Sequence, residues 1–184
     1  MKADPNDIRL RPVTYEDLPD LHAWWSDPQV MRPVRAEKFK VSLQEFQEEY
    51  WPRWRSPAPD QYHQFIITLD GRAIGEIGYL RESADPCTVS VDIKIGLPRL
   101  WGRGLGGRAL GLFLEMLFGQ LKAERVIAQP GAWNQRSLRL FQGAGFQETG
   151  RQEIAPSAIH EGGTMVNLEL DRASYLARRG PRRG

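Results

Sequence analysis

Residues 101–107 form the part of the sequence best suited to do chemistry. They read Trp-Gly-Arg-Gly-Leu-Gly-Gly, after an alternating apolar pattern and before an apolar helical pattern. The first amides of a helix lack backbone partners and carry partial positive charge, and glycines let an anion approach them closely. Arg103 and Arg108 add positive charge. The turn therefore predicts a phosphate-binding site, and a tight turn that needs glycine only for packing is the alternative.

Several other kinds of site do not fit the sequence. No Lys-Ser or Lys-Thr follows the glycines, so the turn is not a nucleoside-triphosphate P-loop. The glycine spacing is not G-x-G-x-x-G, and no acidic residue closes the following strand as a ribose ligand. We also expect no metal centre, because the chain has one cysteine and three histidines that lie far apart in sequence.

Two segments carry recognisable motifs in a fixed order. Residues 101–106 read Trp-Gly-Arg-Gly-Leu-Gly, and residues 134–146 read Asn-Gln-Arg-Ser-Leu-Arg-Leu-Phe-Gln-Gly-Ala-Gly-Phe. The first resembles the Gln/Arg-x-x-Gly-x-Gly/Ala signature of the GNAT superfamily of acyl-CoA-dependent N-acyltransferases, with Trp101 in the Gln/Arg position. The second resembles the Asn-x-x-(Ser/Ala)-x-x-x-(Tyr/Phe)-x-x-x-Gly-Phe helix and turn of that family. The resemblance covers about residues 8–172.

The resemblance implies a fold and an acyl donor. The GNAT fold is an α/β (α+β mixed) fold. It has a mixed, mostly antiparallel sheet of about seven strands flanked by about four helices, and its fourth and fifth strands splay apart. Acetyl-CoA would be the cofactor. The resemblance assigns its pyrophosphate to the glycine turn, its pantetheine arm to the end of the fourth strand, and its thiol end to the Asn helix. The implied cofactor-binding residues are Ile95, Gly96, Leu97, Gly102, Arg103, Gly104, Leu105, Gly106, Gly107, Arg108, Asn134, Ser137 and Phe141.

Proton transfer departs from the pattern of the family. Many members carry a tyrosine in the Asn helix that protonates the leaving thiolate, but this chain has Phe141 there, which has no proton to donate. Ser137, a water molecule or no acid at all would take its place. Asn134 caps its helix, binds the cofactor, or does both.

For the amine, residues 89–108 look most like aminoglycoside 6'-N-acetyltransferases, and similar first-helix patterns occur in ribosomal-protein N-terminal acetyltransferases. In the first branch an aspartate at the position of Asp92 meets the amine, so Asp92 is our first candidate for the general base or amine anchor. A strand carboxylate that faces solvent and pairs with Lys94 is the alternative reading. Glu76 is the second candidate base. The remaining candidate substrate-binding residues are Trp24, Trp25, Gln129 and His160.

The elements that must position these residues follow from hydrophobic periodicity and capping signals. Strands are expected at 8–12, 62–69, 73–80, 88–95, 125–129, 146–154 and 164–170. Helices are expected from Thr14, after the Ser42 capping box, from 105 or 106 to about 121, and over 134–142. This order predicts a mixed sheet with helices packed on it. Residues 1–172 would form one domain, and 173–184 a flexible basic tail.

Composition limits the partners. The chain has 184 residues, a formal net charge of +2 and 41% hydrophobic residues, as expected for a globular domain. Residues 14–60 hold nine acidic against six basic residues, which favours a cationic ligand. No secretory signal or long apolar run is present, so we expect a cytoplasmic protein without membrane or nucleic-acid partners, as monomer or homodimer.

These features favour an acetyl-CoA-dependent N-acetyltransferase that acts on a small-molecule amine resembling an aminoglycoside or a polyamine. Two alternatives stay open, namely an acetyltransferase acting on a protein N-terminus and a non-catalytic acyl-CoA-binding sensor.

Overall fold

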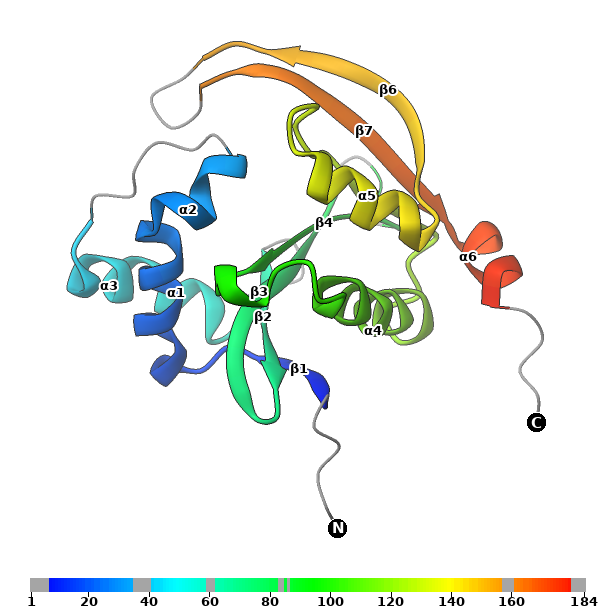
Figure 1. Cartoon of the computed structure of the whole chain (residues 1–184). Coiled ribbons are helices and arrows are strands. Elements are labelled where there is room, and N and C mark those ends of the chain that lie inside the picture. Colours follow the sequence, from blue (N-terminus) through cyan, green and yellow to red (C-terminus); the bar gives the residue numbers. More distant parts are fainter. Residues whose placement is uncertain are drawn as a thin grey trace.

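The computed structural model describes residues 7–34, 41–58, 62–82, 85, 87–156 and 161–179. Its centre is a seven-stranded sheet in the order β1-β2-β3-β4-β5-β7-β6 (Figure 1). Neighbouring strands are antiparallel except for β4 and β5, which are parallel, so the predicted mixed sheet is confirmed. The strands are β1 (Ile8–Pro12), β2 (His63–Leu69), β3 (Arg72–Arg81), β4 (Thr88–Ile95), β5 (Arg125–Ala128), β6 (Gln147–Ile154) and β7 (Gly163–Asp171).

Six α-helices accompany the sheet in the described part of the chain. They are α1 (Leu18–Ser26), α2 (Pro28–Met31), α3 (Leu43–Trp54), α4 (Leu105–Gly119), α5 (Gln135–Ala144) and α6 (Arg172–Arg179). The sequence signals explain where they start. The Ser42 side chain accepts from the Glu45 amide at 3.2 Å, and Glu45 accepts from the Ser42 amide at 2.7 Å. Helix α5 ends at Gly145, whose φ of +107° favours glycine.

Strands β4 and β5 pair over only part of β4. Their register joins Thr88–Ser90 to β5, whereas β4 continues to Ile95. The five residues from Val91 to Ile95 therefore extend past the last β5 partner, and the predicted splay between the two strands is confirmed. This opening lies beside the N-terminal ends of α4 and α5 (Figure 1).

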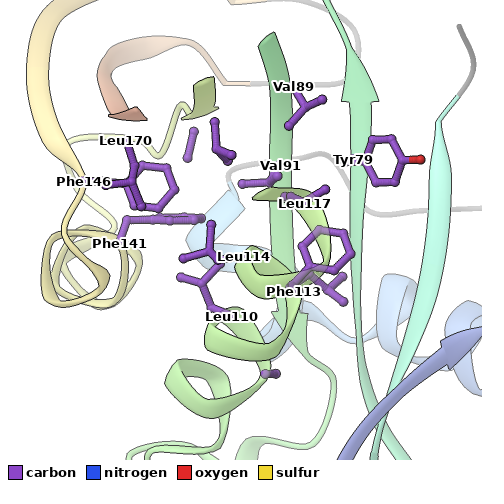
Figure 2. Close-up of a cluster of buried hydrophobic side chains, with 14 of the residues drawn as sticks. Tyr79, Val89, Val91, Leu110, Phe113, Leu114, Leu117, Phe141, Phe146 and Leu170 are labelled. Atoms are coloured by element: carbon purple, nitrogen blue, oxygen red, sulfur yellow. The ribbon is translucent and has the colours of Figure 1, made fainter. Parts of the chain in front are cut away.

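The two faces of the sheet carry separate hydrophobic clusters. Residues 89, 91, 93 and 95 of β4 pack in the larger one with α4, whereas Asp92 and Lys94 point to the opposite face, which α1 and α3 cover. In the larger cluster the ring of Phe141 lies 5.1 Å from that of Phe146, next to Leu170 (Figure 2). Alternation along β4 thus places its apolar residues in the core and its two charged residues, Asp92 and Lys94, on the opposite face.

Two helices differ from the sequence expectation. Helix α2 forms because Pro28 fits the first turn and Asp27 caps it, accepting from the Gln29 amide at 2.8 Å. The tail expected from residue 173 is helical over its described part, because Tyr175 stacks on Phe118 at 4.5 Å and anchors α6 to α4. Residues 173–179 thus form a helix packed on α4, which the sequence did not predict. None of the helices among the described residues has the length and apolar character needed to span a membrane.

Candidate active site

A pocket of about 280 Å³ opens at the splay, and we call it the glycine-turn pocket. Its wall is made by the end of β4, the turn before α4, and the first two turns of α5. Segments 30–34 close it from the other side. The lining residues are Val30, Pro33, Val34, Ile93, Lys94, Ile95, Leu100, Trp101, Gly102, Gly104, Leu105, Gly106, Gly107, Asn134, Arg136, Ser137 and Leu140.

The start of α4 is built to receive an anion. Gly102 and Gly104 have φ values of +74° and +76°, which side-chain-bearing residues rarely adopt, and open space lies where their Cβ atoms would be. Gly104 is the N-cap of α4, and no side chain caps the amides that follow it. The helix therefore presents uncapped N–H groups and its positive dipole end to the pocket, and a phosphate group fits there.

Trp101 and Arg136 form one side of this pocket. The indole Nε1–H of Trp101 donates to the Ile95 carbonyl at 2.8 Å, which ties the turn to the end of β4. The guanidinium of Arg136 lies 4.0 Å from the centre of the Trp101 ring. The Trp variant of the motif thus provides a stacking surface for a cation, and that cation lies beside the helix terminus. The sequence analysis did not select Arg136, although its place in the first turn of the Asn helix was a usable signal.

Most of the predicted cofactor residues line this pocket. Asn134 also accepts a hydrogen bond from the Ser137 amide at 3.1 Å, so it does act as an N-cap. The predicted residues on the lining are Ile95, Gly102, Gly104, Leu105, Gly106, Gly107, Asn134 and Ser137.

Five predicted cofactor residues are not on the lining. Gly96 is buried under the indole of Trp24, and its amide donates to the Ile74 carbonyl at 2.9 Å. Leu97 packs against the larger cluster, and Arg103 and Arg108 are exposed. Phe141 is 3% exposed inside the core, because its position on α5 faces the sheet.

A second pocket, of about 430 Å³, lies on the other face of the sheet, and we call it the aromatic pocket. Side chains from α1, α3 and three strands meet there. Its rings pack edge to face, with centroids 5.3 Å apart for Trp25 and Tyr50 and 6.0 Å apart for Trp25 and Trp54. The lining residues are Trp25, Tyr50, Arg53, Trp54, Tyr62, Gln64, Glu76 and Asp92.

Glu76 is the centre of a hydrogen-bond network at the floor of the aromatic pocket. Its carboxylate accepts from Trp25 Nε1 at 2.7 Å, from Lys94 Nζ at 2.6 Å, and from the amide of Gln64. Glu76 and Lys94 are opposite each other in the β3–β4 register, and only 5% and 18% of their side chains are exposed. The alternative reading paired Asp92 with Lys94. It is wrong about this pair, because Lys94 forms its ion pair with Glu76.

Asp92 lies two residues before Lys94 on β4 and faces the aromatic pocket. The hydroxyl of Tyr62 donates to it, and the Tyr62 ring crosses Gly78, where a Cβ would overlap the ring. Gly78 is the register partner of Asp92, so the missing side chain leaves room for the phenol. Desolvation and the charge of Glu76 raise the pKa of Asp92, although Lys94 and Tyr62 oppose that shift. Desolvation and the nearby carboxylate raise the pKa of Tyr62 well above its ordinary value, so this phenol stays protonated.

The predicted amine-side residues divide into two groups. Asp92, Glu76 and Trp25 line the aromatic pocket. Trp24 lies in the core at 5% exposure, one residue out of phase with the pocket, and Gln129 is at the surface, where it donates to Asn167 at 3.1 Å. His160 lies outside the described residues. Tyr62 was not selected, because its link to Asp92 depends on the pairing of three strands.

The two pockets adjoin through β4. Asp92 lines the aromatic pocket, and the next three residues, 93–95, line the glycine-turn pocket. A groove with three arginines, Arg32, Arg136 and Arg139, continues the glycine-turn pocket and shares Pro33, Asn134 and Arg136 with it. A polyanion that ends in a reactive group could thus lie along α5 and reach β4 beside the aromatic pocket.

Comparisons with known proteins agree with this arrangement. Residues 7–147 match the model of the acetyltransferase (GNAT) domain family. An aminoglycoside N(6')-acetyltransferase type 1 of Klebsiella pneumoniae is 26% identical over 153 residues, which are 78% of this chain and 75% of that protein. An N-acetyltransferase 9-like protein of Nematostella vectensis is 24% identical over 162 residues, 81% of this chain and 79% of that one.

Solved structures share the fold. The aminoglycoside acetyltransferase AAC(6')-Ib in complex with coenzyme A superposes with a TM-score of 0.78 at 21% identity, and covers 95% of this chain and 100% of its own. Spermidine N-acetyltransferase from Vibrio cholerae, in complex with CoA and spermine, gives 0.78 at 18% identity, with 91% and 97% covered. The chain therefore belongs to the GNAT family of acetyltransferases, for which acetyl-CoA is the acyl donor.

Proposed function

We propose that this protein transfers the acetyl group of acetyl-CoA directly to the primary amine of a small molecule. The observation that carries the proposal is the meeting of two pockets on β4, one with an uncapped helix terminus and one with a carboxylate of raised pKa. Relatives of this chain are named for acetylating aminoglycosides, and a structural neighbour for acetylating spermidine, which supports a small-molecule amine.

The donor half of the site would bind acetyl-CoA through backbone amides and positively charged side chains. The amides at the start of α4 would hold the pyrophosphate, because the N-cap residue Gly104 has no side chain to compete for them. The arginines of the groove, Arg136 and Arg139 on α5 and Arg32 opposite, would neutralise the remaining phosphate charge. The thioester of bound acetyl-CoA supplies the activated acetyl carbon. The end of β4 would position the arm of that molecule, since its edge is not covered by β5 there.

The acceptor half removes a proton. An amine attacks only as the neutral base, so its ammonium form must lose a proton in the pocket. Asp92 would accept it, because its raised pKa makes it a stronger base than a carboxylate with an ordinary pKa. Tyr62 would fix the carboxylate by its hydrogen bond and would not itself lose a proton. The new bond joins the amine nitrogen to the acetyl carbon, and the carbon–sulfur bond breaks.

The leaving thiolate then needs a proton. Phe141 contributes nothing, since it is buried in the core and has no acidic group. The hydroxyl of Ser137 lies on the lining of the glycine-turn pocket and is the protein group we assign to this step, with solvent as the final proton source.

The test is release of free CoA thiol from acetyl-CoA in the presence of primary amines and of short peptides. We expect thiol release with small amines, loss of that release in Asp92→Asn, and little release with peptides. Release only with peptides would instead identify a protein N-terminus as the acceptor. Tight binding of acetyl-CoA with no release for any amine or peptide would identify a sensor and refute the proposed transfer.

A further inference from the structure

The described lining of the aromatic pocket has little negative charge to offer a ligand. Among its described lining residues the charged side chains are Arg53, Glu76 and Asp92. The charge of Glu76 is partly compensated within the protein by its ion pair with Lys94 at 2.6 Å. Arg53 pairs with Glu49 on its own helix at 3.4 Å, and 62% of its side chain is exposed, so it changes the charge of the pocket little. Of the two carboxylates on this lining, Asp92 is therefore the one without an ion pair to another described residue.

The acidic excess of residues 14–60 adds no carboxylate to the described lining of the aromatic pocket. The sequence suggested that these acids attract a cationic ligand, but the described ones with a hydrogen bond or ion pair use it elsewhere. They cap helices or pair with nearby side chains, and Asp17 is buried in its ion pair with Arg11 of β1. These residues and their partners are Asp17 with Arg11, Asp27 with the Gln29 amide, Glu45 with the Ser42 amide, Glu48 with Gln44, and Glu49 with Arg53.

The walls of the pocket suit a flat, apolar ligand. Four of the eight lining residues are aromatic, and three of them, Trp25, Tyr50 and Tyr62, are only partly buried, so their rings meet the pocket. Such rings gain dispersion and desolvation energy from a planar apolar group, and their faces attract one nearby cation. A second or third ammonium group would have to give up its hydration against these rings, which is unfavourable without a carboxylate partner.

Building on the proposed function, we propose that the acceptor is a primary monoamine on a flat, apolar frame such as an aromatic ring. We further propose that Lys94 sets this selectivity as a positioning residue that partly compensates the charge of Glu76. The single ammonium would lie at Asp92 and the frame among the aromatic walls. The class differs from the aminoglycosides and spermine named for the relatives, which carry several ammonium groups each.

The wild-type protein provides the first test. Transfer from acetyl-CoA is measured with 2-phenylethylamine, spermine and kanamycin, and binding of each amine to the CoA-loaded protein is followed by indole fluorescence. We expect kcat/KM for 2-phenylethylamine to exceed the other two by tenfold or more. Equal or better use of spermine or kanamycin would overturn the inference. Selective binding of 2-phenylethylamine without transfer would support the ligand class and refute the proposed reaction, and binding of none of the amines would overturn the ligand class.

A charge switch provides the second test. In Lys94→Met the carboxylate of Glu76 is uncovered, so the ratio of kcat/KM for spermine to that for 2-phenylethylamine should rise about tenfold. The double variant Glu76→Gln/Lys94→Met removes both charges and should keep the wild-type ratio, which also serves if the single variant does not fold. Lys122→Met, the same change at the other lysine among the described residues, is the control. An unchanged ratio in folded Lys94→Met, or a raised ratio in the double variant, would refute the role of Lys94.

Discussion

The two pockets that meet on β4 differ in how much of their lining comes from backbone and how much from side chains. The glycine-turn pocket is arranged around the backbone of a glycine turn and comes mainly from two local segments, 93–107 and 134–140, with residues 30–34 on the other side. The aromatic pocket is mostly large side chains from α1, α3, β2, β3 and β4, which are spread over residues 25 to 92. Backbone donors suit a ligand that every member of the family shares, whereas side chains can be exchanged one at a time. Donor binding and amine choice are therefore separable in this fold, and the predictions below probe that separation.

The largest effect is expected at Asp92. Asp92→Asn keeps the shape and the contact to Tyr62 but removes the base, so kcat/KM for the amine should fall about 10²- to 10⁴-fold. Thiol release under saturating acetyl-CoA measures this change. A fall of less than threefold would show that the amine loses its proton elsewhere.

A smaller effect, on the donor side alone, is expected at Gly104. Gly104→Ala forces a Cβ into a left-handed conformation at φ +76°, which costs about 1–2 kcal/mol if the conformation persists. The KM for acetyl-CoA should then rise roughly tenfold, with the KM for the amine unchanged. The matched control is Gly119→Ala at the other end of α4, where a Cβ would also meet open space. Equal effects of the two changes would contradict anion binding at this helix terminus.

Phe141→Tyr tests whether a tyrosine at this position of α5 could protonate the leaving thiolate, as it does in many members of the family. The new hydroxyl would enter a cluster where Phe141 is 3% exposed, so stability should fall by roughly 1–3 kcal/mol unless a partner is found. Turnover of the folded protein should stay the same. Urea denaturation together with kcat measures both quantities, and a clear rise in kcat would place this side chain at the thiol.

The smallest change is a shift of the pH profile. The charge of Glu76 raises the pKa of Asp92, so Glu76→Gln should lower that pKa. Because Asp92 acts in its deprotonated form, the rise of kcat/KM with pH should move to lower pH. The raised pKa also means that the folded state binds the proton more tightly than the unfolded chain. Asp92 therefore contributes stability at acid pH that is lost as the pH rises through the folded value. Asp92→Asn should accordingly raise Tm at neutral pH more than at acid pH.

The sequence was informative where the signal is local. Strand β4 has the predicted bounds of 88 and 95, and the glycine turn and the Ser42 capping box are as expected. These features depend on alternation, capping and glycine conformation, all of which act within a few residues. Trp24 was expected beside Trp25 in the pocket, but in α1 it lies in the core with Leu18 and Leu21, and only Trp25 lines the pocket.

The amine side depended on register and was less predictable. Tyr62 reaches Asp92 only because β2, β3 and β4 pair so that Gly78 lies opposite Asp92. The balance of acids and bases in residues 14–60 pointed to a cationic ligand but could not say which side chains face the pocket, because composition carries no information on direction. Helix α6 was missed because its anchor, Tyr175 on Phe118, joins residues 57 positions apart.

The separation of donor binding from amine chemistry is tested most directly by calorimetric titration of CoA into wild type, Asp92→Asn and Gly104→Ala. We expect Asp92→Asn to bind CoA within twofold of the wild type, and Gly104→Ala to bind about tenfold more weakly, in line with a strained anion site. Loss of CoA affinity in Asp92→Asn as large as that in Gly104→Ala would show that the two pockets act as one, and would contradict the account.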